Sequence, residues 1–414
     1  MKIAYVTMFD ATDVRNWSGT DLHIWKALQK QGIEVELIGN LRHGPSLRRK
    51  LRKLWGQYMQ RKGFLHFWNL QTARAFASDV ADRLGGLAGV DCVLSPTPIP
   101  LAFLECQQPK VLWTDAIFSG LSQCHEEFNP RLLCAATVSD AWSIEREICR
   151  NCDRLVFTSQ WAAGQAVAAG APVEKVAVVP FGANIEVCHN ESDVAAWARR
   201  RGSGPVRLLF VGVDWIRKGA PKAIEVVGCL RQRGADARLT IVGCTHPPGE
   251  SLPDFVNCIG FISKGTVEGR DRISALYRES HFLVVPTLAE AFGLVFAEAS
   301  AFGVPSLSHR VGGVTTIVHD DVNGKLFCME EPTSAWADWV LEQLAIPDRM
   351  EKLAGSSYQR YAARLNWDVA GRTVAKMLAE LVGGDSAGSG GGGHAGAAAQ
   401  DAGGTAGEFA VKHG

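Results

Sequence analysis

The stretch from residue 284 to residue 314 constrains the chain more than any other. It passes from an apolar run through a polar loop into a helical segment, and then into a second apolar run that ends in a Gly-Gly pair. Residues 281–285 predict a buried strand, and Gly293 lets the backbone come close to a ligand where the helix begins. The amide groups of residues 293–295, at the positive end of the helix dipole, are expected to face an anion such as phosphate.

Two carboxylates bracket this helix start, Glu290 in the loop and Glu298 inside the helix. Eight residues at 3.6 residues per turn leave two helical positions about 80° apart, so the pair is expected to reach different parts of one extended ligand. Carboxylates at such a site suit hydrogen bonds to sugar hydroxyls, as in dinucleotide-binding folds. Either glutamate alone would be read as a solvated charge, but the flanking residues favour a functional interpretation.

The flanking pattern is E-A-F-G-L-x-x-x-E, followed by A-x-x-x-G-x-P and then by G-G. It resembles the E-x7-E signature of the retaining glycosyltransferases of family 4. The resemblance implies an α/β chain with the GT-B fold, in which two Rossmann-like domains with parallel sheets face each other across a cleft. It also implies transfer of a sugar, with retention, from a nucleoside-diphosphate sugar to an acceptor hydroxyl.

The same resemblance assigns roles within the stretch. Glu290 would bind hydroxyls of the donor sugar and Glu298 the ribose. The backbone at Phe292, Gly293 and Leu294 would hold the sugar and the phosphates, with Thr315 and Thr316 as neighbours.

Composition narrows the class further. A length of 414 residues suggests two or three domains, and 47% hydrophobic residues are ample for large cores. Lys plus Arg equals Asp plus Glu, 43 each, so the overall charge predicts no polyanionic partner. No apolar run approaches the roughly 18 residues of a membrane span, and the N-terminus turns polar too soon for a signal peptide, so a cytoplasmic protein is expected. The eleven scattered cysteines are interpreted as reduced and structural.

No D-x-D sequence occurs, so the carboxylate pair that holds a divalent metal in the other large transferase fold is missing. We therefore expect catalysis without a bound metal or other cofactor. Cations of the chain would then neutralise the leaving diphosphate.

Alternating strand and helix patterns divide the chain. The divisions are an acceptor-side domain at 1–183, an interdomain linker at 184–205, a donor domain at 206–364, a helix at 365–382 that returns to the first domain, and a disordered Gly/Ala-rich tail at 383–414. Near the end of the donor domain, Asn323-Gly324 predicts a hairpin-like turn.

A second strand-to-helix loop carries two adjacent cations, Arg217 and Lys218. They are predicted to pair with the donor diphosphate. Lys218-Gly219 matches the family's Lys-Gly, whereas Val213 stands where the family usually has an arginine, and Arg217 is the obvious substitute. The alternative is a basic helix start without a ligand.

Three further positions follow from the resemblance. Gly19, in the first strand-to-helix loop, would face the donor diphosphate and the acceptor, although a simple tight turn is the competing interpretation. Asp115 would serve the acceptor, because Thr114 stands where the family has a histidine. Backbone near Ile262 would hold the nucleobase. The nearby His125 is interpreted as a surface residue.

Residues 37–78 contain no acidic side chain but nine basic ones. Within them, residues 46–62 show apolar and aromatic positions at helical spacing flanked by cations. This segment is predicted to lie on an anionic membrane surface, or else to be an ordinary amphipathic helix packed on its own domain. Nucleic acid ranks last, because no binding motif accompanies the patch.

The sequence thus predicts a glycosyltransferase that uses a nucleotide-sugar donor and an unidentified glycan, lipid-linked or small-molecule acceptor. A role in bacterial glycan or glycoconjugate synthesis is the family-level expectation. Two alternatives stay open at this point. One is a non-catalytic nucleotide-sugar-binding protein, and the other is a nucleotide-sugar epimerase or a phosphorylase on the same fold.

Overall fold

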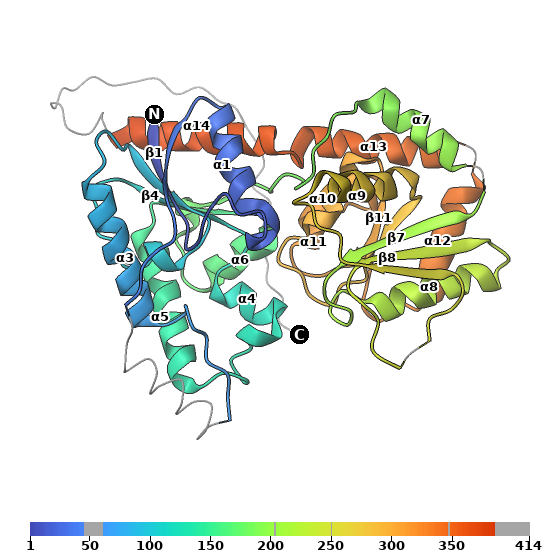
Figure 1. Ribbon diagram of the computed structural model, residues 1–414, viewed down its shortest axis with the longest axis horizontal. Coiled ribbons are helices and arrows are strands. Elements are labelled where there is room, and N and C mark those ends of the chain that lie inside the picture. The colour runs from blue at the N-terminus through green and yellow to red at the C-terminus, as the bar shows by residue number, and fades with distance from the viewer. Residues whose placement is uncertain (45–60, 203, 250, 347, 386–414) are drawn as a thin grey trace, which may run out of the picture.

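The computed structural model describes residues 1–44, 61–202, 204–249, 251–346 and 348–385. Almost all of the predicted membrane-binding segment, residues 46–62, lies outside the described residues, and so does the tail from residue 386 onward. Figure 1 shows two α/β units side by side, joined along one side by the C-terminal helix.

The first unit is a six-stranded parallel sheet in the order β2-β1-β3-β4-β5-β6. Its strands are β1 Lys2–Val6, β2 Glu34–Ile38, β3 Cys92–Ser95, β4 Lys110–Thr114, β5 Arg154–Phe157 and β6 Val176–Val178. Its helices are α1 Thr20–Lys30, α3 Leu70–Gly85, α4 Phe118–Cys124, α5 Ala135–Asn151 and α6 Gln160–Ala168.

The second unit is a parallel sheet in the order β12-β11-β10-β7-β8-β9. Its strands are β7 Val206–Gly212, β8 Ala237–Gly243, β9 Val256–Gly260, β10 Phe282–Val284, β11 Ser306–His309 and β12 Gly324–Phe327. Its helices are α8 Ala220–Gln232, α9 Val267–Glu279, α10 Leu294–Ala301, α11 Val314–Ile317, α12 Thr333–Ala345 and α13 Arg349–Arg364. Read from β9, this is the strand order of the Rossmann fold, and it reverses direction between β7 and β10.

The turn at Asn323-Gly324 does not form the predicted hairpin. β12 pairs in parallel with β11, with Ser306 beside Gly324. Two parallel strands cannot be joined by a hairpin and need a crossover connection, which here contains α11. The Asn-Gly pair therefore forms a turn before β12 without forming a hairpin.

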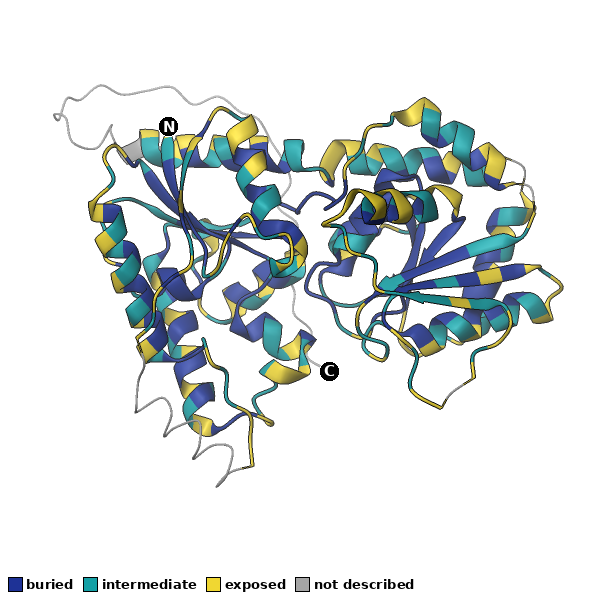
Figure 2. Ribbon diagram, viewed as in Figure 1, coloured by how far each residue is buried: buried dark blue, intermediate teal, exposed yellow. Residues whose placement is uncertain are grey.

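The burial of these strands explains why their sequences are runs of apolar residues. Parallel sheets are covered by helices on both faces, so their strands are almost continuously hydrophobic. Leu208, Leu209 and Phe210 of β7 are at most 1% exposed. In Figure 2 the inner strands are mostly in the colour of buried residues, whereas edge strands such as β9 are largely not.

The segment expected to be a linker, residues 184–205, contains a helix, α7, Glu191–Arg201. Asn190 and Asp193 form a capping box at its start. Val194 and Ala198 of α7 pack with Ala354 of α13. The polar composition of this segment therefore reflects a surface helix of the second unit rather than an irregular connection.

Two chain crossings join the units, and they touch each other. Ala183 donates its amide hydrogen to the Leu365 carbonyl at 3.0 Å, and the Trp367 indole donates to the Asn184 side chain at 3.1 Å. A Cβ at Gly182 would lie 2.3 Å from the Trp367 backbone nitrogen, so only glycine fits there. The helix that follows, α14 Trp367–Asp385, then packs against α1 of the first unit.

No helix among the described residues combines the length and the apolar character that a membrane crossing requires. All eleven cysteines lie in described residues, and none of them forms a disulfide.

Candidate functional site

The carboxyl ends of β7 and β10 carry the predicted cations and the first glutamate. These two strands are neighbours at the point where the sheet order reverses, which is where ligands bind in open α/β sheets. Hydrogen bonds join their loops: the Leu288 amide and the Thr287 hydroxyl both donate to the Arg217 carbonyl, at 2.8 and 3.2 Å. The fold therefore places the two loops as one structure.

Lys218 and Glu290 form an ion pair across these loops. Their side chains are only 13% and 11% exposed, so the pair is largely shielded from water. Arg217 lies beside it, donating to the Ala289 carbonyl at 3.1 Å and pairing with Asp214 at 3.4 Å. The structure thus brings Arg217, Lys218 and Glu290 together, and it shows Lys218 already engaged by the carboxylate.

The Gly-Gly pair after β11 is explained by the Glu290 loop. A Cβ at Gly312 would lie 2.0 Å from the Glu290 carbonyl oxygen, and one at Gly313 would lie 1.9 Å from the Ala291 oxygen. The Gly313 amide donates to the Glu290 carbonyl at 2.9 Å. Both glycines are needed because the backbone that carries the glutamate passes directly over them.

Helix α10 begins at the predicted place. Gly293 is its N-cap with φ 96°, a left-handed conformation that favours glycine, and a Cβ there would lie 2.6 Å from the Phe296 ring. The buried Phe292 ring packs edge-on against Phe181 of the first unit, with the ring centroids 5.7 Å apart. Leu294 is half-buried. Of these three residues, Phe292 and Gly293 could contact a ligand only through the backbone, whereas the Leu294 side chain is partly accessible.

Glu298 is fully buried in α10 rather than solvated. Its carboxylate pairs with Lys264 and accepts a hydrogen bond from the Tyr277 hydroxyl at 3.1 Å. Lys264 comes from the loop after β9, and its side chain is 31% exposed. In this conformation, Lys264 therefore stands between Glu298 and solvent.

Asp115 follows β4 and brings a second carboxylate toward Glu290 from the first unit. Burial, and after it the negative charge of Glu290, raise the pKa of Asp115 to about 7. The Trp17 side chain hydrogen-bonds to this carboxyl group and opposes the shift. Ala116, next to Asp115, packs with Cys124 and Ala291, so the two units meet beside the Glu290 loop.

Gly19 and Ile262 lie in loops on either side of the domain boundary. Gly19 caps α1 with φ 78°, and it follows two residues that also have positive φ, Trp17 and Ser18. Ile262 is partly buried against the core, and a Cβ at nearby Gly265 would lie 3.3 Å from Val14 of the first unit. Within the described residues, no hydrogen bond or ion pair joins Gly19 or Ile262 to the Lys218–Glu290 pair.

Sequence reasoning missed two features of this site. The pairing of Lys264 with Glu298 was not predicted, because the two residues lie 34 positions apart in the chain. His125, interpreted as a surface residue, lies close enough for the site's charges to act on it: burial lowers its pKa, and Arg217 lowers it further.

The predicted neighbour Thr316 contacts the first unit instead, accepting a hydrogen bond from the Gln160 amide at 3.1 Å.

The two Rossmann-like units, each built on a six-stranded parallel sheet, have the architecture of the GT-B fold. Solved structures support this assignment. Sucrose-phosphate synthase from Thermosynechococcus elongatus superposes with a TM-score of 0.68 at 18% identity, covering 93% of this chain and 100% of that one. Anabaena Alr3699/HepE, solved in complex with UDP and glucose, gives 0.59 at 16% identity, covering 92% and 100%.

Sequence comparison supports the same assignment for the second domain. Residues 205–345 match the family described as Glycosyl transferases group 1, so the resemblance seen in the sequence is confirmed there. D-inositol 3-phosphate glycosyltransferases are similar over a longer stretch. That of Salinispora tropica is 33% identical over 254 residues, or 56% of this chain and 52% of the relative. That of Nocardiopsis dassonvillei is 32% identical over 248 residues, 56% of each chain. The match thus spans about half the length of these relatives.

Proposed function

We propose that this protein transfers a sugar from a nucleoside-diphosphate sugar to an acceptor hydroxyl, with retention at the anomeric carbon. The observation that carries the proposal is the meeting of Arg217, Lys218 and Glu290 at the switch point of the second sheet, with Asp115 of the first domain beside them. The UDP and UDP-glucose bound to Anabaena Alr3699/HepE, a protein of the same fold, support a donor of this class.

In the proposed complex the diphosphate accepts hydrogen bonds from Lys218 and Arg217. Lys218 then exchanges the Glu290 carboxylate for a phosphate oxygen, and the released carboxylate accepts hydrogen bonds from hydroxyls of the donor sugar. The amides at the start of α10 add dipoles aimed at the same phosphates. Charge on the leaving nucleoside diphosphate is stabilised by cations already in place, which is the largest contribution that such a site makes to rate.

The transfer step breaks the bond between the anomeric carbon and the diphosphate oxygen, and forms one between that carbon and the acceptor oxygen. We propose front-side attack, in which a phosphate oxygen of the departing diphosphate takes the acceptor's proton. This route needs no protein nucleophile, and it gives retention because bond formation and bond breaking occur on one face of the sugar. Asp115 orients the acceptor hydroxyl from the first domain.

Glu298 is proposed to bind the donor ribose once Lys264 moves aside, and the backbone near Ile262 to hold the nucleobase.

We further propose that the reaction needs no resident metal, because Arg217 and Lys218 supply the positive charge. A cytoplasmic role in bacterial glycan synthesis, at a membrane surface contacted by residues 46–62, stays a prediction from the sequence.

Hydrolysis of a panel of nucleoside-diphosphate sugars tests the proposal. Slow release of nucleoside diphosphate from one donor, unaffected by EDTA, is expected from a metal-independent transferase whose acceptor is missing. Glu290→Gln should lower this rate by about 10²-fold. The control is Glu268→Gln, an exposed glutamate in the first turn of α9, which should leave it unchanged.

The other outcomes identify the alternatives. An unchanged donor that nevertheless binds would indicate a non-catalytic nucleotide-sugar-binding protein. A new sugar isomer without release of nucleoside diphosphate would indicate an epimerase. Full turnover by Glu290→Gln would show that the site has been assigned to the wrong residues.

A further inference from the structure

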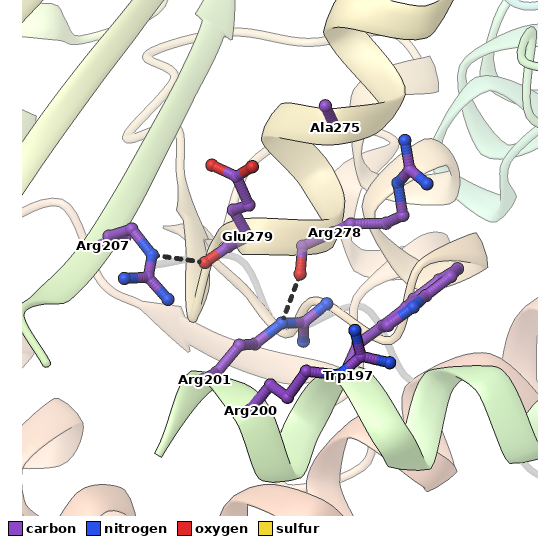
Figure 3. Close-up of a pocket in the computed structure, with 7 residues that line it drawn as sticks. All are labelled: Trp197, Arg200, Arg201, Arg207, Ala275, Arg278 and Glu279. Atoms are coloured by element: carbon purple, nitrogen blue, oxygen red, sulfur yellow. Dashed lines mark hydrogen bonds between the residues drawn. The ribbon is translucent and has the colours of Figure 1, made fainter. Parts of the chain in front are cut away.

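A cavity of about 340 Å³ opens on the second domain, away from the site described above. It lies between the C-terminal half of α7, the first residues of β7 and the last turn of α9 (Figure 3). Arg207 stands at the amino end of β7, whereas Lys218 follows its carboxyl end. Seven strand residues rise by roughly 20 Å, so the cavity and the Lys218–Glu290 pair are at opposite edges of the sheet. The lining residues are Trp197, Arg200, Arg201, Arg207, Ala275, Arg278 and Glu279.

The lining is strongly basic, with four guanidinium groups and one carboxylate. Among the described residues, no carboxylate lies within ion-pair distance of Arg201, Arg207 or Arg278, and that of Glu279 pairs with no cation. In Figure 3 the Glu279 carboxylate points away from the guanidinium groups of Arg201 and Arg207. Within the part of the chain that the structure describes, the charges of Arg201, Arg207 and Arg278 are therefore not balanced by a paired carboxylate.

Arg201 contributes positive charge to the cavity, but its guanidinium nitrogens already donate to the protein's own carbonyls. It is 3% exposed, and its nitrogens donate to four backbone carbonyls, among them Arg278 at 2.9 Å, Gly303 at 2.8 Å and Phe302 at 2.9 Å. These carbonyls end α9 and α10, so Arg201 caps both helices. Burial, and after it the charge of Arg207, lower the pKa of Arg201 to about 9, as expected where cations gather without an anion.

Arg207 and Arg278 line the cavity on different sides, and they carry its unused donors. Arg207 uses its Nε to donate to the Glu279 carbonyl at 2.8 Å, and its two terminal nitrogens have no hydrogen-bond partner among the described residues. Arg278 lies over the Trp197 ring at 5.9 Å, and its terminal nitrogens are likewise without such a partner. A planar guanidinium with free terminal nitrogens is suited to binding phosphate through two parallel hydrogen bonds.

Helix capping explains only part of this cluster. Basic residues at the C-terminal ends of helices are favourable for the dipole, which accounts for Arg201 and for the Nε bond of Arg207. Helix capping accounts neither for the unpaired terminal nitrogens of Arg207 and Arg278 nor for a cavity that has the volume of a small-molecule site. We propose that this cavity binds the phosphate group of a small soluble ligand, at a site separate from that of the sugar donor.

Calorimetric titration of the full chain with inorganic phosphate, at an ionic strength held constant with chloride, tests the proposal. Saturable binding is expected, and Arg278→Gln and Arg207→Gln should each weaken it at least about tenfold. The matched control is Arg272→Gln, an exposed arginine on the same helix and outside the cavity, which should bind like the unmodified protein. Lys218→Met should also retain the binding, since that residue belongs to the opposite edge of the sheet.

Three results would overturn the inference. They are binding that depends on Lys218 but not on Arg278, no saturable binding to phosphate, and binding only to phosphatidylcholine vesicles that contain phosphatidic acid, which would indicate a lipid headgroup. If Arg207→Gln proves unfolded in a thermal scan, Arg207→Lys replaces it. Lysine keeps the charge but loses the paired donors, so a weaker affinity is still expected.

Discussion

Clustered cations stand at both edges of the second sheet, and the two clusters differ in what neutralises them. At the carboxyl edge, Lys218 and Lys264 are paired with Glu290 and Glu298. At the amino edge, Arg201 and Arg207 bond to backbone carbonyls, with no carboxylate within ion-pair distance among the described residues. A cation that already has a carboxylate must exchange it to bind an anion, whereas one bonded only to carbonyls need not.

This difference implies different ligands. Breaking a shielded ion pair leaves a carboxylate that needs new hydrogen-bond donors, and an anionic phosphate offers fewer of them than a sugar with several hydroxyls. A nucleoside-diphosphate sugar supplies oxygens for Lys218 and hydroxyls for Glu290 together. We therefore propose that the carboxyl edge selects a ligand with both groups, and that the amino edge binds phosphate alone.

The largest expected effect is on transfer. Lys218→Met and Glu290→Gln should each lower the rate by about 10²-fold, and the double variant should lose far less than the product, with a coupling of about 2 kcal/mol, because the two groups act on each other. Turnover of the four proteins with the best donor measures this coupling. Lys376→Met on the exposed face of α14 serves as the control.

The same set of two single variants and one double variant, made at the amino edge, sharpens the comparison. Arg207→Gln and Glu279→Gln should show almost no coupling in phosphate affinity, because the two side chains form no ion pair and Arg207 bonds to the Glu279 backbone instead. Strong coupling there, or strictly additive effects at Lys218 and Glu290, would contradict the distinction drawn between the two edges.

An intermediate effect is expected at the second glutamate. Glu298→Gln should weaken the binding of the nucleoside diphosphate by about tenfold, since an amide replaces the carboxylate proposed to bind the ribose hydroxyls. The amide oxygen still accepts the Tyr277 hydrogen bond, so the fold should survive. Titration calorimetry gives the affinity, and unchanged binding would remove Glu298 from the donor site.

The smallest effect concerns the other carboxylate near Glu290. The folded protein holds the Asp115 proton up to about pH 7, whereas the unfolded chain loses it near pH 4, so stability should fall as the pH rises through that interval. Asp115→Asn removes this loss, and should be more stable than the unmodified protein at pH 8 by on the order of 1 kcal/mol, with little difference at pH 4.

Thermal unfolding at both pH values checks this expectation. Asp82→Asn, on the exposed face of α3, provides the control and should show the same difference at each pH. A stability difference for Asp115→Asn that does not change between pH 4 and pH 8 would mean that its carboxyl group ionises as an ordinary exposed aspartate does.

Much of the second domain was predictable because its signals are local. The strand before Glu290, the helix start at Gly293 and the Gly-Gly pair all lie between residues 282 and 313, and the loop that carries Glu290 contacts each of the last two. By contrast, Lys264 reaches Glu298 only through the packing of α9 against the sheet, and no spacing in the chain encodes that contact.

The arginine cavity escaped prediction for a related reason. Arg201 appeared in the sequence as part of a polar linker, yet it caps two helices that begin far along the chain. The capping box of α7, Asn190 with Asp193, was a readable signal that a helix begins there. What the helix buries, however, depends on the tertiary fold.

The pair of chain crossings between the domains has a mechanical consequence. The crossings meet at one place, because Ala183 bonds to Leu365 and only glycine at position 182 fits against Trp367. Sliding one domain past the other would break these contacts, whereas a rotation about this place would keep them. Such a rotation would change the separation of Asp115 and Glu290, which belong to different domains.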